Sequence, residues 1–319
     1  MRAAVTVRKA NLVALLSDDL AAAHGYAAAD KAAETRRAYQ SDFKAFTAYC
    51  LRAGQSSLPA TPAVVAAFVA SEAQRGISAS SIARRIASIR YSHKLAGHET
   101  PTDDEKVKSV VRGIRKSIGT KPAKKSPATA DLVARMLDTC PATLRGKRDR
   151  ALLALGFAGA FRRSELVALE VADLVETADG FRVVIRHSKT DQEGAGQEIA
   201  IPRGTRLRPV EAVRAWLAGA KIETGPIFRP INRGGRVVNA RLTAESAAQV
   251  VKDAAERAGL DPVAFAGHSL RAGFLTSAAA AGASIFKMMD QSRHKSVETL
   301  RGYVRDADRF KEHAGTKFL

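Results

Sequence analysis

The chain has 319 residues, and its 51 lysines and arginines outnumber 32 aspartates and glutamates to give a formal net charge of +19. Its two cysteines, Cys50 and Cys140, are too few for a disulfide framework. No apolar run reaches the roughly 18 residues that a membrane span needs. These features exclude a disulfide-stabilised secreted domain and an integral membrane protein, and we expect a cytoplasmic protein with reduced thiols.

The length predicts two domains, because a single core rarely serves more than about 250–300 residues. Positive charge is in excess in both parts of the chain: residues 1–118 hold 18 basic and 10 acidic side chains, and residues 119–319 hold 33 and 22. An excess spread over two domains favours a polyanion held between them. The alternative is a protein that is merely basic.

Residues 1–30 are alanine-rich and weakly patterned, and we expect a loosely ordered lead-in with one helix near Leu12 to Ala23. Residues 31–118 then show helical periodicity, with turn and cap residues between the helices. The expected helices run from Lys31 to Gly54, Pro62 to Gly76, Ser80 to Gly97 and Thr102 to Ile118. This region is predicted to be a helical domain.

One face of the third expected helix is basic, and so is the segment that follows the helical domain. A basic helical face suits the backbone or groove of a nucleic acid, although a charged face is more often simply solvated. Residues 119–128 contain two prolines and no large apolar side chain, which predicts a basic linker. The candidate DNA-binding residues are Arg84, Arg85, Arg90, Lys94, Lys121, Lys124 and Lys125.

Residues 129–319 predict a second, larger domain that is mainly helical with a small antiparallel sheet. β-branched residues indicate strands from Phe181 to Arg186 and from Gln197 to Pro202, and Lys189 falls in the hairpin between them. The fold class is therefore mainly α with a small sheet (α+β). Helices are expected near 129–138, 147–158, 164–169, 210–217, 243–258, 269–280, 285–289 and 297–303.

Several side chains in this domain could act on a phosphate. Arg162 and Glu165 lie three residues apart, so the carboxylate could direct the guanidinium, although an ordinary surface ion pair has the same spacing. His268 and Arg271 repeat this spacing, which could arise by chance in so basic a chain. Tyr303, taken alone, is more typical of an apolar helix face than of a nucleophile.

The order of these residues is more specific than any one of them. The chain reads Ala160-Phe-Arg-Arg-Ser-Glu-Leu166, then Lys189-Thr190, then Gly267-His-Ser-Leu-Arg271, then His294, and Tyr303 nine residues later. This set resembles the tyrosine recombinase (phage integrase) family, and most closely its Cre-like branch. Two departures stand out: Ala160 replaces a glycine, and Ser292-Arg293-His294 replaces the usual Leu-Gly-His.

The resemblance implies a two-domain DNA clamp with a SAM-like core-binding domain (31–118) and a catalytic domain (129–319) of tyrosine recombinase fold, whose tail, 304–319, docks on a neighbouring subunit. It implies a tetramer on two specific sites in double-stranded DNA, a Holliday junction, and an accessory or directionality protein in some systems. No metal or cofactor is implied. Such a protein would be nucleoid-associated when DNA-bound.

The implied chemistry is DNA cleavage and rejoining through a 3′-phosphotyrosine. Tyr303 would be the nucleophile, and Lys189 would protonate the leaving oxygen. The remaining implied catalytic residues are Arg162, Arg271 and His294 on the phosphate, His268 at the tyrosine proton, and Glu165 as an orienting carboxylate. Two alternatives stay open: a type IB topoisomerase, which religates the same strand, and a catalytically silent DNA-binding protein.

Overall fold

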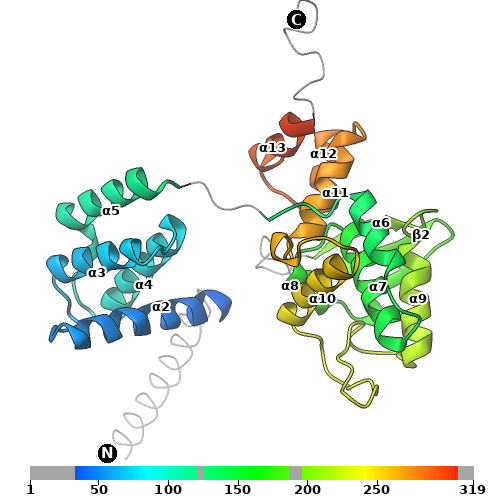
Figure 1. Cartoon of the computed structure of the whole chain (residues 1–319), viewed down its shortest axis with the longest axis horizontal. Coiled ribbons are helices and arrows are strands. Elements are labelled where there is room, and N and C mark those ends of the chain that lie inside the picture. The colour runs from blue at the N-terminus through cyan, green and yellow to red at the C-terminus, as the bar shows by residue number, and fades with distance from the viewer. Residues whose placement is uncertain (1–32, 121–124, 187–195, 308–319) are drawn as a thin grey trace, which may run out of the picture. The chain divides into compact units, whose positions relative to one another are not determined.

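The structure, a computed structural model, describes residues 33–120, 125–186 and 196–307. The chain forms two compact units that divide after Ala123. Each unit has its own hydrophobic core. Figure 1 shows the helices and strands of each unit. No described helix is both long and apolar enough to cross a membrane.

The N-terminal unit is a small helical domain. Its helices are α2 (Ala33–Arg52), α3 (Pro62–Gln74), α4 (Ala79–Leu95) and α5 (Glu105–Ile118). Thr61 and Ser78 cap the starts of α3 and α4, where their hydroxyls accept backbone N–H groups that the helix leaves free. The core residues are apolar side chains that recur at helical spacing: Phe46, Cys50, Val65, Phe68, Val69, Ile82, Ile89 and Val107.

The last helix of this unit begins later than the sequence indicated. Residues Pro101–Asp103 form a 3₁₀ turn, and α5 starts at Glu105 instead of Thr102. The side chain of Asp104 accepts a hydrogen bond from the backbone N–H of Lys106 at 2.8 Å. This cap sets the start of α5, because it satisfies a donor of the first turn.

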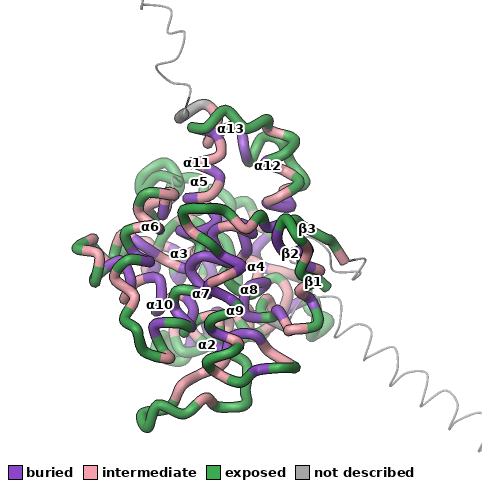
Figure 2. Tube along the Cα trace, turned by 90° about the vertical axis from the view of Figure 1, so that its right-hand side faces the viewer, coloured by how far each residue is buried: buried purple, intermediate pink, exposed green. Residues whose placement is uncertain are grey.

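The C-terminal unit is built around α7 (Leu144–Ala158), whose second half is apolar on every side. Its residues from Ala151 to Phe157 are buried without a break, as the purple stretches near α7 in Figure 2 show. α6 (Ala130–Asp138) and α9 (Pro209–Ala220) pack on α7. Trp216 of α9 is fully buried and donates its indole N–H to the carbonyl of Ile227 at 2.8 Å. A helix buried on all sides needs such neighbours.

A three-stranded antiparallel sheet lies at the edge of this core. Its strands are β1 (Leu174–Glu176), β2 (Gly180–Ile185) and β3 (Gln197–Pro202), in the order β1-β2-β3. Val183 pairs with Ile199, and alternate residues of β2 face the core. The strands β2 and β3 agree with the expected ones, whereas β1 was not predicted. Lys189 lies outside the described residues.

The remaining helices carry or adjoin the described catalytic candidates. They are α8 (Arg163–Ala168), α10 (Ala244–Arg257), α11 (Ser269–Ala280), α12 (Ile285–Ser292) and α13 (Val297–Ala307). Figure 1 shows α12 and α13 next to each other, beyond α11, and all three helices are in contact. α13 continues past Tyr303, since no glycine or proline follows until Gly315.

The described start of the C-terminal unit packs closely against α11. Ala128 donates its backbone N–H to the carbonyl of Ser269 at 2.9 Å, and Ala130 donates to the hydroxyl of Ser277 at 2.9 Å. Gly273 faces this segment so closely that a Cβ atom would lie 1.7 Å from the carbonyl oxygen of Ala128. Only glycine fits at this position, and the contact fixes the position of α11 relative to the segment around Ala128.

Candidate active site

Arg162 and Glu165 form a locked pair at the start of α8. The Glu165 carboxylate accepts the backbone N–H of Arg162 at 2.9 Å and its guanidinium Nη1 at 2.5 Å. The carboxylate therefore caps the helix and directs the arginine at once. Glu165 is buried, with a side chain that is 2% exposed, while Arg162 keeps a partly open surface. The pair is not the ordinary surface ion pair that the spacing also allowed.

Arg271 reaches the same place from α11. Its Nη1 donates to the carbonyl of Ala160 at 2.7 Å, and its Nη2 lies 3.2 Å from Nε2 of His294. Arg271 is buried, and burial together with the charges of Arg162 and Arg293 lowers its pKa to about 9. The guanidiniums of Arg162, Arg271 and Arg293 thus lie near one another and make a region that favours an anion.

His294 follows the end of α12 and is oriented by Ser292. The Ser292 hydroxyl donates to the carbonyl of Met288 at 2.6 Å, so its lone pair is left to accept Nδ1–H of His294 at 2.7 Å. Burial and the charge of Arg271 lower the pKa of His294 to about 4. The imidazole is therefore neutral at neutral pH.

His268 precedes α11, one turn before Arg271. Its ring is more open than that of His294, yet partial burial and the charges of Arg271 and Arg162 lower its pKa. His268 is thus predominantly neutral near pH 7 and is able to accept a proton. The residue before it, Gly267, faces the side chain of Arg163, so His268 lies where the start of α11 meets the start of α8.

Tyr303 lies on α13, where it packs against a small apolar cluster with Leu275, Met288 and Leu300 at its centre. Burial raises the pKa of its phenol, and the charge of Arg271 opposes this rise in part. The hydroxyl is therefore protonated at neutral pH, and it needs a proton acceptor to become a nucleophile. Leu275 lies one turn after Arg271 on α11, so this packing brings α13 against the helix that carries Arg271.

Arg293 belongs to this cluster, and the sequence reasoning missed it. Its Nη2 donates to Glu165 at 2.7 Å, and both side chains are 2% exposed. Burial lowers the pKa of Arg293, although Glu165 acts in the opposite direction. Burial alone would raise the pKa of Glu165, but the charge of Arg293 and the hydrogen bonds of Arg162 lower it overall. The only signal in the sequence was an arginine where the resemblance expects glycine.

The candidate DNA-binding residues are placed differently from the catalytic candidates. On α4, Arg84 donates to Asp42 at 2.6 Å, Arg85 pairs with Glu72, and Arg90 pairs with Asp103. Each of these arginines is therefore engaged by a carboxylate of the same unit, and Arg85 is only 18% exposed.

Of the basic linker residues, Lys125 donates to the carbonyl of Val263 at 2.8 Å. Lys94 is exposed on α4. Lys121 and Lys124 lie outside the described residues, as do the lead-in and most of the tail. Contact of all these residues with DNA stays a prediction.

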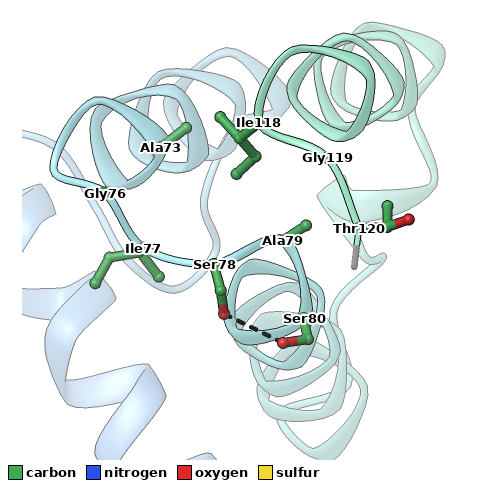
Figure 3. Close-up of a pocket in the computed structure, with 9 residues that line it drawn as sticks. All are labelled: Ala73, Gly76, Ile77, Ser78, Ala79, Ser80, Ile118, Gly119 and Thr120. Atoms are coloured by element: carbon green, nitrogen blue, oxygen red, sulfur yellow. Dashed lines mark hydrogen bonds between the residues drawn. The ribbon is translucent and has the colours of Figure 1, made fainter. Parts of the chain in front are cut away.

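A hollow of about 160 Å³ lies in the N-terminal unit, between the α3–α4 turn and the end of α5. Figure 3 shows its lining, in which the hydroxyls of Ser78 and Ser80 are 3.1 Å apart. No side chain that lines it is ionisable. Within the described ranges, no three His, Cys, Asp or Glu side chains are grouped so that they could hold a metal ion. The polar cluster of the C-terminal unit is therefore the candidate site.

Comparison with known proteins supports the same assignment. Residues 128–309 match the Phage integrase family, and residues 26–100 match the Phage integrase, N-terminal SAM-like domain. An integrase/recombinase xerD homolog of Selenomonas ruminantium is 40% identical over 292 residues, which cover 89% of this chain and 85% of that protein. The recombinase cre of Escherichia phage P1 is 23% identical over 83% of this chain and 82% of its own length.

Solved structures share the fold. A lambda integrase dimer bound to a COC′ core site has a TM-score of 0.60 at 19% identity, over 90% of this chain and 75% of that one. The XerH site-specific recombinase in a post-cleavage complex with difH has a TM-score of 0.59 at 15% identity, over 81% and 72%. Because the match over residues 128–309 includes the arginine, histidine and tyrosine cluster and covers more than half of the chain, the chain belongs to the phage integrase family and is a site-specific recombinase of the tyrosine type.

Proposed function

We propose that this recombinase cleaves and rejoins DNA strands through a 3′-phosphotyrosine on Tyr303. The observation that carries the proposal is the convergence of Arg162, Arg271 and His294 at one place, with Tyr303 on α13, which packs on the helix that carries Arg271. Nonbridging phosphate oxygens gain charge during attack, and guanidiniums held in place stabilise that charge. A cluster of cations with a protonated phenol beside it suits this reaction.

The proposed reaction replaces one ester with another. The Tyr303 oxygen attacks phosphorus as its proton passes toward His268, and the bond from phosphorus to the 5′ oxygen breaks. Lys189 gives a proton to the departing 5′ oxygen, which leaves as a hydroxyl. The reverse attack by a 5′-hydroxyl restores the phosphodiester and releases Tyr303. Attack by the hydroxyl of a different strand exchanges strands, and the bond energy is retained throughout.

The two arginines would share the phosphate, and His294, held by Ser292 through Nδ1–H, would orient Arg271 by accepting a hydrogen bond from its Nη2. Arg271 is anchored by one nitrogen to Ala160, while its other nitrogen faces His294. Arg162 is anchored to Glu165 through Nη1. Each guanidinium has further N–H donors, so each could bind a nonbridging oxygen and keep its anchor.

The larger organisation is proposed from the family. It comprises a core-binding domain over 31–118, a linker over 119–128 and a catalytic domain over 129–319, and the tail 304–319 would join neighbouring subunits. Two recombination sites would be held by a tetramer that passes through a Holliday junction. The symmetry of such a tetramer would let each cleaved strand of one site join the corresponding strand of the other site.

An exposed hairpin of the C-terminal unit adds a proposed DNA-contact surface. In this arginine hairpin (residues 229–241), Ile231 pairs with Val237, and Asn232 donates to the carbonyl of Arg236 at 3.0 Å. Arg233 and Arg236 are exposed, and neither guanidinium bonds to another described residue. Free guanidiniums on an ordered hairpin suit phosphate contacts.

Covalent trapping tests the proposed chemistry. The protein is incubated with nicked DNA that carries sequence from around its own gene, and is then denatured. We expect a protein–DNA band with the wild type and with Tyr49→Phe, a matched tyrosine of the N-terminal unit, but none with Tyr303→Phe. A band that persists in Tyr303→Phe means that the nucleophile is another residue. Salt-sensitive binding without a band on any substrate favours a silent DNA-binding protein.

A second assay separates recombination from topoisomerase activity. Supercoiled DNA and two linear duplexes with the mapped site are supplied together. Recombinant duplexes are expected, because the reaction needs a strand from a second site. Relaxation without exchange at any protein concentration would favour the topoisomerase reaction.

A further inference from the structure

Arg293 takes a backbone conformation that arginine rarely adopts. It ends α12 with φ 59° and ψ 39°, in the left-handed region, and its backbone N–H donates to the carbonyl of Met289 at 2.6 Å. Glycine is the usual residue at such a helix end, since a Cβ atom is disfavoured there. A strained arginine in place of glycine indicates that its side chain has a compensating role.

The guanidinium of Arg293 makes that role specific. Nη1 donates to the carbonyls of Gln291 at 2.6 Å and Gly159 at 3.1 Å, and Nη2 donates to Glu165 at 2.7 Å and to Ala160 at 3.2 Å. The guanidinium carbon lies 5.2 Å from the centroid of the Phe161 ring. The side chain therefore connects the end of α12 with the segment that leads into α8.

Two of the four groups that accept hydrogen bonds from Arg293 also hold a residue of the active site. Glu165 directs Arg162, and the Ala160 carbonyl accepts a hydrogen bond from Arg271. His294 is the next residue in the chain after Arg293. Arg293 itself has a side chain that is 2% exposed, and its charge faces Glu165.

We propose that Arg293 is a positioning residue that fixes Arg162, Arg271 and His294 relative to one another for attack on the scissile phosphate. This inference rests on the proposed function. The planar, forked guanidinium of arginine is needed, because this one group donates hydrogen bonds to a carboxylate and to three carbonyls that lie around it. Lysine has the charge but lacks this geometry.

Two substitutions separate positioning from folding. Arg293→Gly removes the guanidinium and relieves the left-handed backbone, while Arg293→Lys keeps the charge. Arg148→Met is the matched control, since Arg148 is another buried arginine of the same unit, bonded to Asp149 at 2.7 Å on α7. Each protein is checked by thermal melting before its activity is measured.

The readouts are the single-turnover cleavage rate on the mapped nicked DNA and the Kd for the same DNA. We expect both Arg293 variants to cleave about 100-fold more slowly, as small misplacements of catalytic groups do, with Kd within about threefold of wild type. Arg148→Met, compared per folded molecule, should keep both values within about threefold. In the Glu165→Gln protein, the further substitution Arg293→Gly should slow cleavage by a smaller factor than it does in the wild type, because the two side chains act through one contact.

Three results would overturn the inference. They are cleavage by Arg293→Gly within about threefold of wild type, full rescue by lysine, and losses of cleavage and DNA affinity in the Arg293 variants that only follow their loss of folded protein. Failure of the proposed function looks different: in that case the wild type itself forms no covalent product.

Discussion

Arg271 and Arg293 both donate a hydrogen bond to the carbonyl oxygen of Ala160, at 2.7 and 3.2 Å. The two arginines come from α11 and from the end of α12, and Ala160 holds its carbonyl between them with φ 45°, in the left-handed region. One peptide group thus joins two segments that lie more than 100 residues away from it. The arrangement brings two positive charges together, and Glu165 is the carboxylate that compensates them.

Removal of the Glu165 charge should therefore destabilise the protein. Glu165→Gln leaves Arg162, Arg271 and Arg293 near one another without a counter-charge, and removal of one partner of a buried pair costs about 3–5 kcal/mol. We expect the free energy of unfolding to fall by about 3 kcal/mol or more, measured by urea denaturation. The control is Glu298→Gln, which breaks the exposed pair with Arg301 and should cost less than about 1 kcal/mol. Equal effects of the two substitutions would contradict this reading.

Acid should destabilise the C-terminal unit through His294. Its pKa is about 4 in the folded protein against an ordinary value of about 6.5, so between these values the unfolded chain binds a proton that the folded protein does not. Stability is therefore lost as pH falls from about 6.5 to about 4, by at most about 1.4 kcal/mol per pH unit for one proton.

His294→Gln should reduce this slope over the same pH range, as followed by urea unfolding at successive pH values. His268 shifts in the same direction, so a weaker slope remains in that variant. An unchanged slope in the double variant with His268→Gln would show that neither imidazole is responsible.

Much of the fold could be predicted because its signals are local. Threonine and serine caps mark the starts of α3 and α4, and alternation marks β2. The strand β1 could not be predicted, since Leu174–Glu176 is too short to show alternation and is defined by its pairing with β2.

The arrangement of the candidate site was predictable only in part. The order of Arg162, His268, Arg271, His294 and Tyr303 pointed to their convergence, and the structure links them by hydrogen bonds or electrostatic effects. The role of Arg293 could not be read from the sequence, because its partner Glu165 lies 128 residues away. Nor could the sequence show that Arg84 of α4 pairs with Asp42 of α2.

The arginine hairpin should contribute to DNA affinity through charge alone. Replacement of Arg233 and Arg236 by alanine would remove up to two phosphate contacts, and the slope of log K against log salt should become shallower by up to about 1.8. Titrations of one duplex at several salt concentrations measure this slope. Arg206→Ala is the control, since Arg206 is exposed but paired with Asp131 at 2.7 Å. If the control and the hairpin variant change the slope equally, the hairpin is not a distinct contact surface.

The close approach of α11 to the start of the C-terminal unit gives a prediction about stability. A Cβ atom on Gly273 would lie 1.7 Å from the Ala128 carbonyl oxygen, so Gly273→Ala must displace backbone and should cost about 3 kcal/mol or more. Gly113 is the matched control: it lies inside α5 with nothing within 4 Å of an added Cβ, and Gly113→Ala should stabilise its helix by up to about 1 kcal/mol. Urea denaturation of both variants tests the pair.

Because Arg271 lies two residues before Gly273 on the same helix, a destabilised but folded Gly273→Ala protein should also cleave DNA more slowly, while Gly113→Ala should cleave at the wild-type rate. Wild-type stability of Gly273→Ala would mean that α11 can shift freely against this segment, and that the contact does not fix the position of Arg271.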